Sequence, residues 1–151
     1  MITQPIIAPV RESLTVERDL EDAFRIFTAE MTTWWPFEPH SIGGGETERV
    51  TLEPRVGGRL YETMRSGAEH EWGRVTAWDP PNRVVFAWYP GDEPERATEV
   101  EIRFAAADGN TRVDLEHRGW ERLGERAAES RDAYSNGWPR VLGRFVEAAG
   151  D

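Results

Sequence analysis

The sequence predicts an α+β fold in which a curved antiparallel sheet of about six or seven strands wraps around a long C-terminal helix. Two patterns carry this prediction. From Arg49 to His117, apolar residues recur at every second position, which is typical of half-buried strands. Nearer the C-terminus they recur at helical spacing instead. We expect one domain over residues 1–151, because this length is ordinary for a single hydrophobic core.

A strand and two short helices are predicted before the main run of strands. Val10–Val16 alternates between apolar and polar residues, as a half-buried strand does. Asp19 is suited to cap a helix N-terminus, and apolar residues follow at helical spacing from Leu20 to Phe27. A second short helix is predicted over residues 29–35, and Pro36 ends it.

Six further strands are separated by turn signals. We predict them at residues 50–52, 60–64, 71–78, 84–89, 100–104 and 113–117. The turns contain Gly57-Gly58, Asp79-Pro80-Pro81-Asn82 and Asp108-Gly109-Asn110. The glycine-rich segment from Pro39 to Glu46 lacks the spacing of a dinucleotide-binding fingerprint. It predicts a mobile loop, with a ligand-gating lid as the alternative.

The last third of the chain predicts the long helix. Its apolar residues form one continuous stripe: Tyr134, Trp138, Val141, Leu142, Phe145 and Ala149. Pro139 removes a backbone donor, so we expect either a kink or the start of the helix near Gly137-Trp138.

Composition excludes several classes of function. The chain has no cysteine and no lysine, which excludes thiol nucleophiles, thiolate metal sites and Schiff-base lysines. Its net charge of -10, with arginines scattered among acidic residues, argues against nucleic acid as a partner. No apolar run reaches the ~20 residues that span a bilayer, and no secretory signal is recognisable. We expect a cytoplasmic protein without membrane insertion.

The polar residues suggest little metal or nucleophilic chemistry. His40, His70 and His117 lack partners at the spacing of a helical zinc site, so we expect no metal and no cofactor. No Gly-x-Ser-x-Gly elbow is present, which argues against a serine nucleophile. Glu62 and Glu71 share strand parity with apolar neighbours and are predicted to face inward. Arg74 or Arg103 would then be their partners, because a buried charge must be paired.

His117 is the strongest candidate for acid-base chemistry. It shares strand parity with Val113 and Leu115, so its imidazole should point toward the final helix, near Tyr134. Together, His117 and Tyr134 could transfer a proton near neutral pH. A hydrogen-bonded core histidine at the rim of a cavity explains the same pattern, and both interpretations stay open.

Five motifs in order resemble those of a known family. They are Arg55-Val56-Gly57-Gly58-Arg59, Trp72-Gly73-Arg74-Val75 with Trp78-Asp79-Pro80-Pro81, Arg83-Val84-Val85-Phe86-Ala87-Trp88, Val113-Asp114-Leu115-Glu116-His117-Arg118-Gly119-Trp120, and Gly137-Trp138 followed by Val141-Leu142 and Phe145. The chain resembles the C-terminal domain of activators of heat-shock-protein-90 ATPase homologues (AHSA-like), in the START-like, or SRPBCC, superfamily. The resemblance implies a helix-grip (START-like, Bet v-type) fold with a cavity between sheet and helix. Members of this superfamily bind lipids, sterols, polyketides and plant hormones.

Aromatic residues are abundant on the elements that would surround such a cavity. Seven tryptophans occur in 151 residues. Five of them, two other aromatic residues and the two polar candidates form the predicted ligand-binding set: Trp35, Tyr61, Trp72, Phe86, Trp88, His117, Trp120, Tyr134 and Trp138. Packed rings that fill the interior are the alternative.

Three functions follow from these observations. The preferred hypothesis is a non-enzymatic binding domain for an apolar small molecule such as a lipid or polyketide. The second is a cyclase or dehydratase-type enzyme that uses His117 and Tyr134, which requires both side chains to face one solvent-reachable pocket. The third is a protein-interaction module, either co-chaperone-like or a homodimer, which would need Trp34, Trp35, Pro36 and Phe37 exposed as a patch.

Overall fold

One curled antiparallel sheet forms the frame of the protein. The computed structural model describes residues 7–150. Seven strands pair in the order β1-β7-β6-β5-β4-β3-β2, and every pair is antiparallel. Their bounds are β1 Val10–Val16, β2 Thr47–Leu52, β3 Arg59–Met64, β4 Glu69–Asp79, β5 Arg83–Trp88, β6 Thr98–Ala107 and β7 Asn110–Arg118. The predicted fold class is therefore confirmed.

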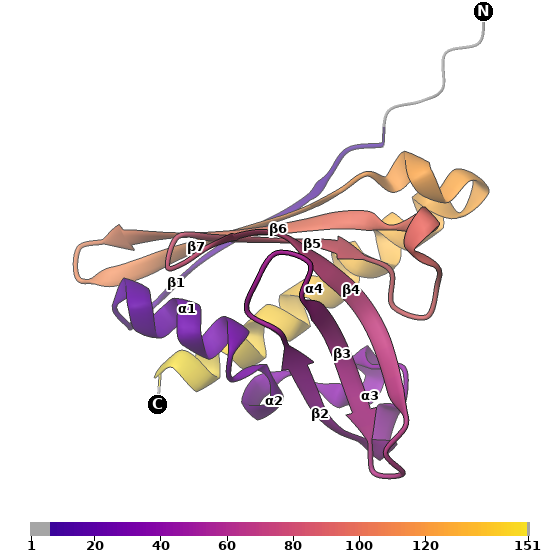
Figure 1. Cartoon of the computed structure of the whole chain (residues 1–151). Coiled ribbons are helices and arrows are strands. Elements are labelled where there is room, and N and C mark those ends of the chain that lie inside the picture. The colour runs from indigo at the N-terminus through magenta and orange to yellow at the C-terminus, as the bar shows by residue number, and fades with distance from the viewer. Residues whose placement is uncertain (1–6, 151) are drawn as a thin grey trace, which may run out of the picture.

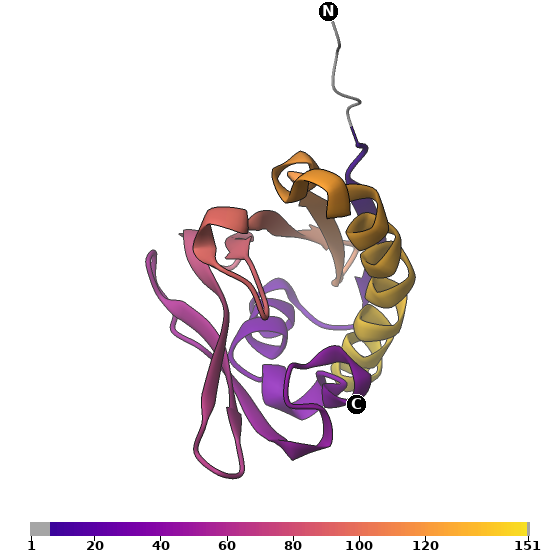
Figure 2. The same ribbon diagram turned by 90° about the vertical axis from the view of Figure 1, so that its right-hand side faces the viewer.

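Helices line the concave side of this sheet. The long helix α4 (Ala127–Gly150) crosses the open side of the half-barrel, and two of the short helices, α1 (Leu20–Thr28) and α2 (Met31–Trp34), pack against it (Figures 1 and 2). The third short helix is α3 (Phe37–His40), and 3-10 turns occur at Gly44–Glu46, Pro94–Arg96 and Trp120–Arg126. As predicted, Asp19 caps α1, since its side chain accepts a hydrogen bond of 2.8 Å from the Asp22 amide.

Two predictions about the helices are corrected. The helix α4 begins at Ala127 and continues through Pro139, so the predicted start near Gly137-Trp138 is wrong. Proline removes one helical N–H, and Pro139 is exposed, so water can satisfy the carbonyl that loses its donor. The segment predicted as a loop from Pro39 contains the end of α3 and a 3-10 turn.

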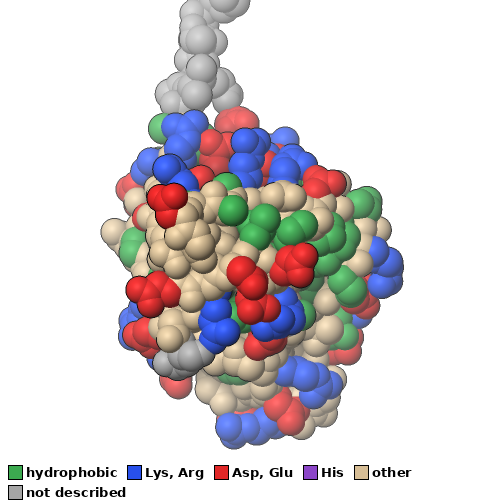
Figure 3. Space-filling model, turned by 90° about the vertical axis from the view of Figure 1, so that its left-hand side faces the viewer, with side chains coloured by type: hydrophobic (Ala, Val, Ile, Leu, Met, Phe, Trp, Pro, Cys, Tyr) green, Lys and Arg blue, Asp and Glu red, His purple; other side chains and the backbone are tan. Residues whose placement is uncertain are grey.

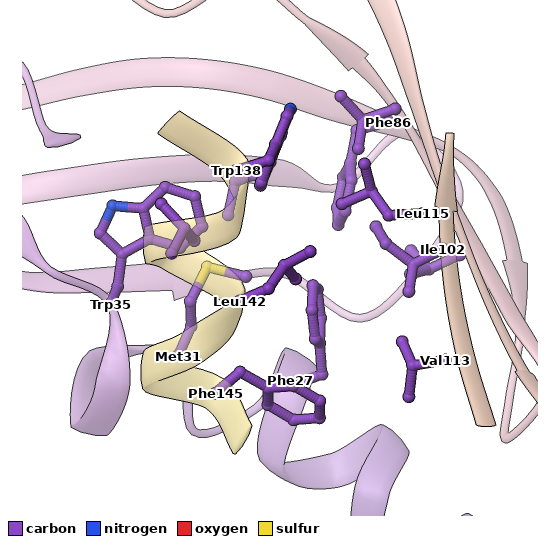
Figure 4. Packing of buried hydrophobic residues seen from close by; sticks show 14 of the residues in the cluster. Phe27, Met31, Trp35, Phe86, Ile102, Val113, Leu115, Trp138, Leu142 and Phe145 are labelled. Atoms are coloured by element: carbon purple, nitrogen blue, oxygen red, sulfur yellow. The ribbon is translucent and has the colours of Figure 1, made fainter. Parts of the chain in front are cut away.

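One end of the interior is packed solid with phenylalanine and tryptophan rings. Phe27 contacts Trp34, Phe104 and Phe145 with ring centroids 5.0–5.7 Å apart, mostly edge to face. Phe24 contacts Phe104 at 5.1 Å. Figure 4 shows Phe27 and Phe145 together, away from Trp35 and Trp138 at the other end of the cluster. Such offset and edge contacts add to the burial of the rings.

The patch required by the interaction hypothesis is absent from the surface. Trp34 and Trp35 are only 2% and 7% exposed, and Pro36 is also buried. Both indoles pack inside the sheet instead, because α2 turns its apolar side toward α4. Figure 3 shows one outer face, where basic and acidic side chains alternate with small groups of hydrophobic ones.

Candidate ligand-binding site

A pocket of about 430 Å³ lies between the sheet and the N-terminal half of α4. It is lined by Trp35, His40, Ser41, Ile42, Trp72, Trp88, Pro90, Ala133, Tyr134, Gly137, Trp138 and Val141. Ile42 and Ala133 are exposed, so the pocket reaches solvent between the α3–β2 loop and α4. Five predicted ligand-binding residues line this pocket: Trp35, Trp72, Trp88, Tyr134 and Trp138.

The four lining indoles are fixed to the walls of the pocket by hydrogen bonds. Each N–H donates to a protein acceptor: Trp35 to the His40 carbonyl (2.7 Å), Trp72 to the Glu62 carboxylate (2.6 Å), Trp88 to the Tyr134 hydroxyl (3.0 Å) and Trp138 to His117 Nδ1 (3.0 Å). Neighbouring ring centroids are 5.0–6.3 Å apart. The N–H groups of the four tryptophans are therefore already occupied by protein acceptors.

His117 lies behind the lining and not on it. Its side chain is fully buried, and its ring accepts from Trp138 at Nδ1, so Nε2 carries the proton and donates to Thr98 Oγ1 at 2.7 Å. Thr98 in turn donates to the Trp88 carbonyl at 3.3 Å. Burial lowers the pKa of His117 to about 3, which keeps the imidazole neutral. The inward direction predicted for His117 is correct, but the enzyme hypothesis required contact with the pocket, which His117 does not have.

Two titratable groups do border the pocket, and sequence reasoning singled out only one of them. Burial raises the pKa of Tyr134, and the hydrogen bond from Trp88 only partly opposes this. His40, at the end of α3, has its pKa lowered by burial and by the nearby Arg140 guanidinium. His40 packs against the backbone of Gly137, where an added Cβ would lie 3.2 Å from His40 Cε1.

Helical spacing could have identified two of the lining residues that the predicted ligand-binding set lacks. Gly137 and Val141 follow Tyr134 at i+3 and i+7, so they belong to the same face of α4 as the predicted stripe. Nothing comparable marked His40, Ser41 and Ile42, because their positions depend on how the α3–β2 connection folds.

Glu62 joins that connection to the wall of the pocket. Its buried carboxylate accepts from the amides of Ile42 and Gly43, both at 2.7 Å, from Thr47 Oγ1 at 2.9 Å, and from Trp72. Burial alone would raise the pKa of Glu62, but these hydrogen bonds outweigh it and lower the pKa. Glu62 faces inward as predicted, but neither Arg74 nor Arg103 is its partner; of the predicted pairs, Arg74 with Glu71 is the one that forms.

Those arginines lie on the outer face of the sheet. Arg74 pairs with Glu71 at 3.2 Å, and Arg103 pairs with Glu101 at 2.8 Å. Glu71 also accepts from the Tyr89 hydroxyl there, so its predicted inward direction is wrong. The cause is a bulge, since Leu60 pairs with Gly73 but Tyr61 pairs with Glu71, which leaves Trp72 as an extra residue.

The other predicted lining residues lie elsewhere. Tyr61 is on the outer face, with the Arg59 guanidinium 4.1 Å from its ring centroid. Phe86 is buried in the core beyond the pocket. Trp120 stacks on His117 at 4.1 Å and lines a second, smaller hollow of about 120 Å³, which shares Trp88, Pro90 and Tyr134 with the main pocket.

Among residues 7–150, no group of three or more histidine, aspartate or glutamate side chains could hold a metal ion. In the same part of the chain, no helix has the length and apolarity needed to span a membrane.

Comparison with known proteins decides the family. The family model described as "Activator of Hsp90 ATPase homolog 1-like protein" matches residues 18–150. The chain belongs to this family. The resemblance found in the five motifs is thus confirmed, together with the helix-grip fold. A search of curated proteins found no match.

Two of the similar solved structures are at least 30% identical to this chain. An anthrahydroquino-gamma-pyrone synthase, Txn09, solved in complex with SUM, is 33% identical, with 95% of this chain and 99% of that chain covered and a TM-score of 0.65. The self-sacrificing resistance protein CalC from Micromonospora echinospora is 30% identical, with 94% of each chain covered and a TM-score of 0.67. The Aha1 dimer from Colwellia psychrerythraea, at 17% identity and a TM-score of 0.67 over 95% of this chain and 96% of that chain, shares the fold.

Proposed function

We propose that this AHSA1-like protein binds a flat, mainly apolar aromatic small molecule of polyketide type. The observation that carries the proposal is the pocket of about 430 Å³ whose lining includes four tryptophans. Ligand pockets commonly measure about 300–1,000 Å³ and are mostly apolar with a few polar groups. Aromatic ring surfaces favour flat aromatic ligands, through burial of apolar area and through offset or edge contacts.

One of these relatives, the synthase, supports a ligand with fused aromatic rings. The 33% identical synthase is named for an anthrahydroquino-gamma-pyrone, which is a fused aromatic ring system. The 30% identical relative is a resistance protein. Binding of a lipid or another apolar ligand stays an alternative outcome of the test. A cytoplasmic location and a homodimer stay predictions.

A matched pair of substitutions on α4 tests the proposal. Val141 lines the pocket and is buried, whereas Val146 on the same helix is 37% exposed. Titration with 9,10-anthraquinone, followed by equilibrium dialysis, should show saturable binding of one molecule per chain. Val141→Trp should weaken that binding at least tenfold because the new indole occupies the pocket, and Val146→Trp should leave it unchanged. Equal binding by both variants, each shown to be folded by thermal unfolding, would exclude the pocket as the site.

A second candidate function is an enzyme on the same pocket. It is favoured by the synthase among the relatives and by His40 and Tyr134, the two titratable groups on the pocket lining. A neutral imidazole beside a bound ring system could accept a proton from an acidic carbon. Anthrone provides the test, because proton abstraction from its methylene carbon and return of a deuteron from D₂O exchanges hydrogen without other change. Faster exchange with protein than with buffer, abolished by His40→Phe, would support this function, and an unchanged rate would exclude it.

A further inference from the structure

Among the side chains of residues 7–150 that line the pocket, those of Tyr134 and His40 have hydrogen-bonding atoms without a protein partner. All four lining indole N–H groups donate to protein acceptors, as described above. The Ser41 hydroxyl, also on the lining, donates to the Phe37 carbonyl at 2.6 Å and lies 3.0 Å from Thr47 Oγ1. The side chains of Tyr134 and His40 therefore remain as the candidates for polar contact with a ligand.

Tyr134 has an unused donor. Its hydroxyl oxygen accepts the Trp88 N–H at 3.0 Å, and within residues 7–150 no acceptor receives the hydroxyl hydrogen. Tyr134 is partly buried and its hydroxyl borders the pocket, so a ligand oxygen could accept this hydrogen bond. Burial raises the pKa of Tyr134, which keeps the phenol protonated and able to donate.

His40 has unused ring nitrogens. Its carbonyl takes the Trp35 N–H, but neither imidazole nitrogen has a hydrogen-bond partner in the part of the chain that the structure describes. A neutral imidazole has one donor and one acceptor nitrogen. The ring packs over Gly137, three residues after Tyr134 on α4, so both free groups border the same side of the pocket.

From this arrangement we infer that the pocket selects fused aromatic ligands that carry a carbonyl, bound by the Tyr134 hydroxyl, and a hydroxyl group, bound by the His40 imidazole. The ligand class is a hydroxylated quinone or a related hydroxy-ketone of a fused ring system. The inference rests on the proposed function and narrows it from apolar aromatic ligands to those with one polar edge toward α4.

Three probes of the same ring shape separate the two contacts. Anthracene has neither polar group, 9,10-anthraquinone has carbonyls only, and 2-hydroxyanthraquinone has both. Dissociation constants would be measured by equilibrium dialysis for the unmodified protein, Tyr134→Phe and His40→Phe. Tyr61→Phe serves as the matched control, because Tyr61 lies on the outer face of the sheet.

The expected pattern is specific to each variant. Tyr134→Phe should weaken binding of both quinones about five- to tenfold, the effect of losing one hydrogen bond that a buried ligand oxygen needs. His40→Phe should weaken binding of 2-hydroxyanthraquinone alone, by a similar factor. Anthracene binding should change in neither variant, which also shows that the pocket is intact, and Tyr61→Phe should change nothing.

Two different failures are distinguishable. If each variant changes the affinity for all three probes by the same factor, Tyr134 and His40 contribute shape only, and this inference is overturned while the proposed function stands. If the unmodified protein binds none of the probes, the proposed function itself fails and the inference fails with it.

Discussion

Both ends of the interior are built from aromatic side chains, but one end is closely packed and the other contains a pocket. At the end near α1, Phe24, Phe27, Phe104 and Phe145 interlock with Trp34, and none of these five residues lines either pocket described above. At the end near α3, four tryptophans in contact with one another line part of a pocket of about 430 Å³. Aromatic content alone therefore does not distinguish a core from a binding site.

Hydrogen bonding accounts for much of the difference. A phenylalanine ring has no polar atom and moves toward the best packing. Each lining tryptophan donates its N–H to a different element. The four acceptors lie on β3, β7, α4 and the end of α3. Closing the pocket would break these bonds and leave buried donors unpaired, which is unfavourable.

The largest effect on stability is expected at the packed end. Phe145→Ala removes a fully buried ring that contacts Phe27 and Trp34. It should lower the free energy of unfolding by about 3–5 kcal/mol, the range for a large ring lost from a close-packed core. Chemical denaturation measures this, with Val146→Ala on the same helix as the control. A loss below about 1 kcal/mol would show that this end is not closely packed.

Glu62 provides the next largest effect, at the hollow end. Glu62→Gln replaces an acceptor-only group by an amide, so at least one donor among Ile42, Gly43, Thr47 and Trp72 loses its partner. We expect a loss of about 2–3 kcal/mol in the free energy of unfolding. The exposed Glu69, which pairs with Arg59, is the control, and Glu69→Gln should cost under about 1 kcal/mol. Equal losses for the two variants would contradict the role given to Glu62.

The regular elements were predictable, and the residues around the pocket were only partly so. Alternation located every strand, and the stripe from Tyr134 to Ala149 located the inner face of α4, because burial on one side imposes these periods. Trp72 is a lining residue as predicted, but the bulge that turns it inward also turns Glu71 outward. A bulge adds a residue without a reliable mark in the sequence, so parity fails beyond it.

Tyr61 and His40 show two further kinds of error. Tyr61 alternates with the buried Leu60 and Glu62, so strict parity already placed it outside. Hydrophobic periodicity could not place His40, because this residue lies at the α3–β2 connection. The course of that connection depends on the hydrogen bonds to Glu62 and on Gly137, which has no Cβ to crowd the His40 ring.

A smaller effect should come from releasing one indole. Trp138→Phe removes the N–H that bonds His117 Nδ1 and leaves that buried acceptor unpaired. The free energy of unfolding should fall by about 2 kcal/mol from the lost hydrogen bond and lost volume. Denaturant titration measures it. Trp78→Phe is a suitable control, since Trp78 is only partly buried and lies outside the pocket lining. An effect no larger than that of the control would mean that N–H bonds do not hold the walls.

The smallest effect is a pH dependence that arises from His117. Burial lowers its folded-state pKa to about 3, against about 6.5 in an unfolded chain, so below pH 6.5 only the unfolded state takes up the proton. This contribution to stability is complete above pH 6.5 and falls by about 1.4 kcal/mol per pH unit below it. Denaturation between pH 6.5 and 5.0 should show a shallower slope for His117→Leu than for the unmodified protein. His40, whose pKa is also lowered, contributes in the same direction in both proteins. Identical slopes would contradict a neutral buried His117.

The most direct test of the hollow end is a crystal structure of the protein grown with 2-hydroxyanthraquinone. We expect one flat molecule in the pocket that Trp35, Trp88 and Trp138 line, with all four lining indoles still bonded to their protein acceptors. Indoles released from those acceptors and packed together in the space, with no molecule bound there, would contradict it.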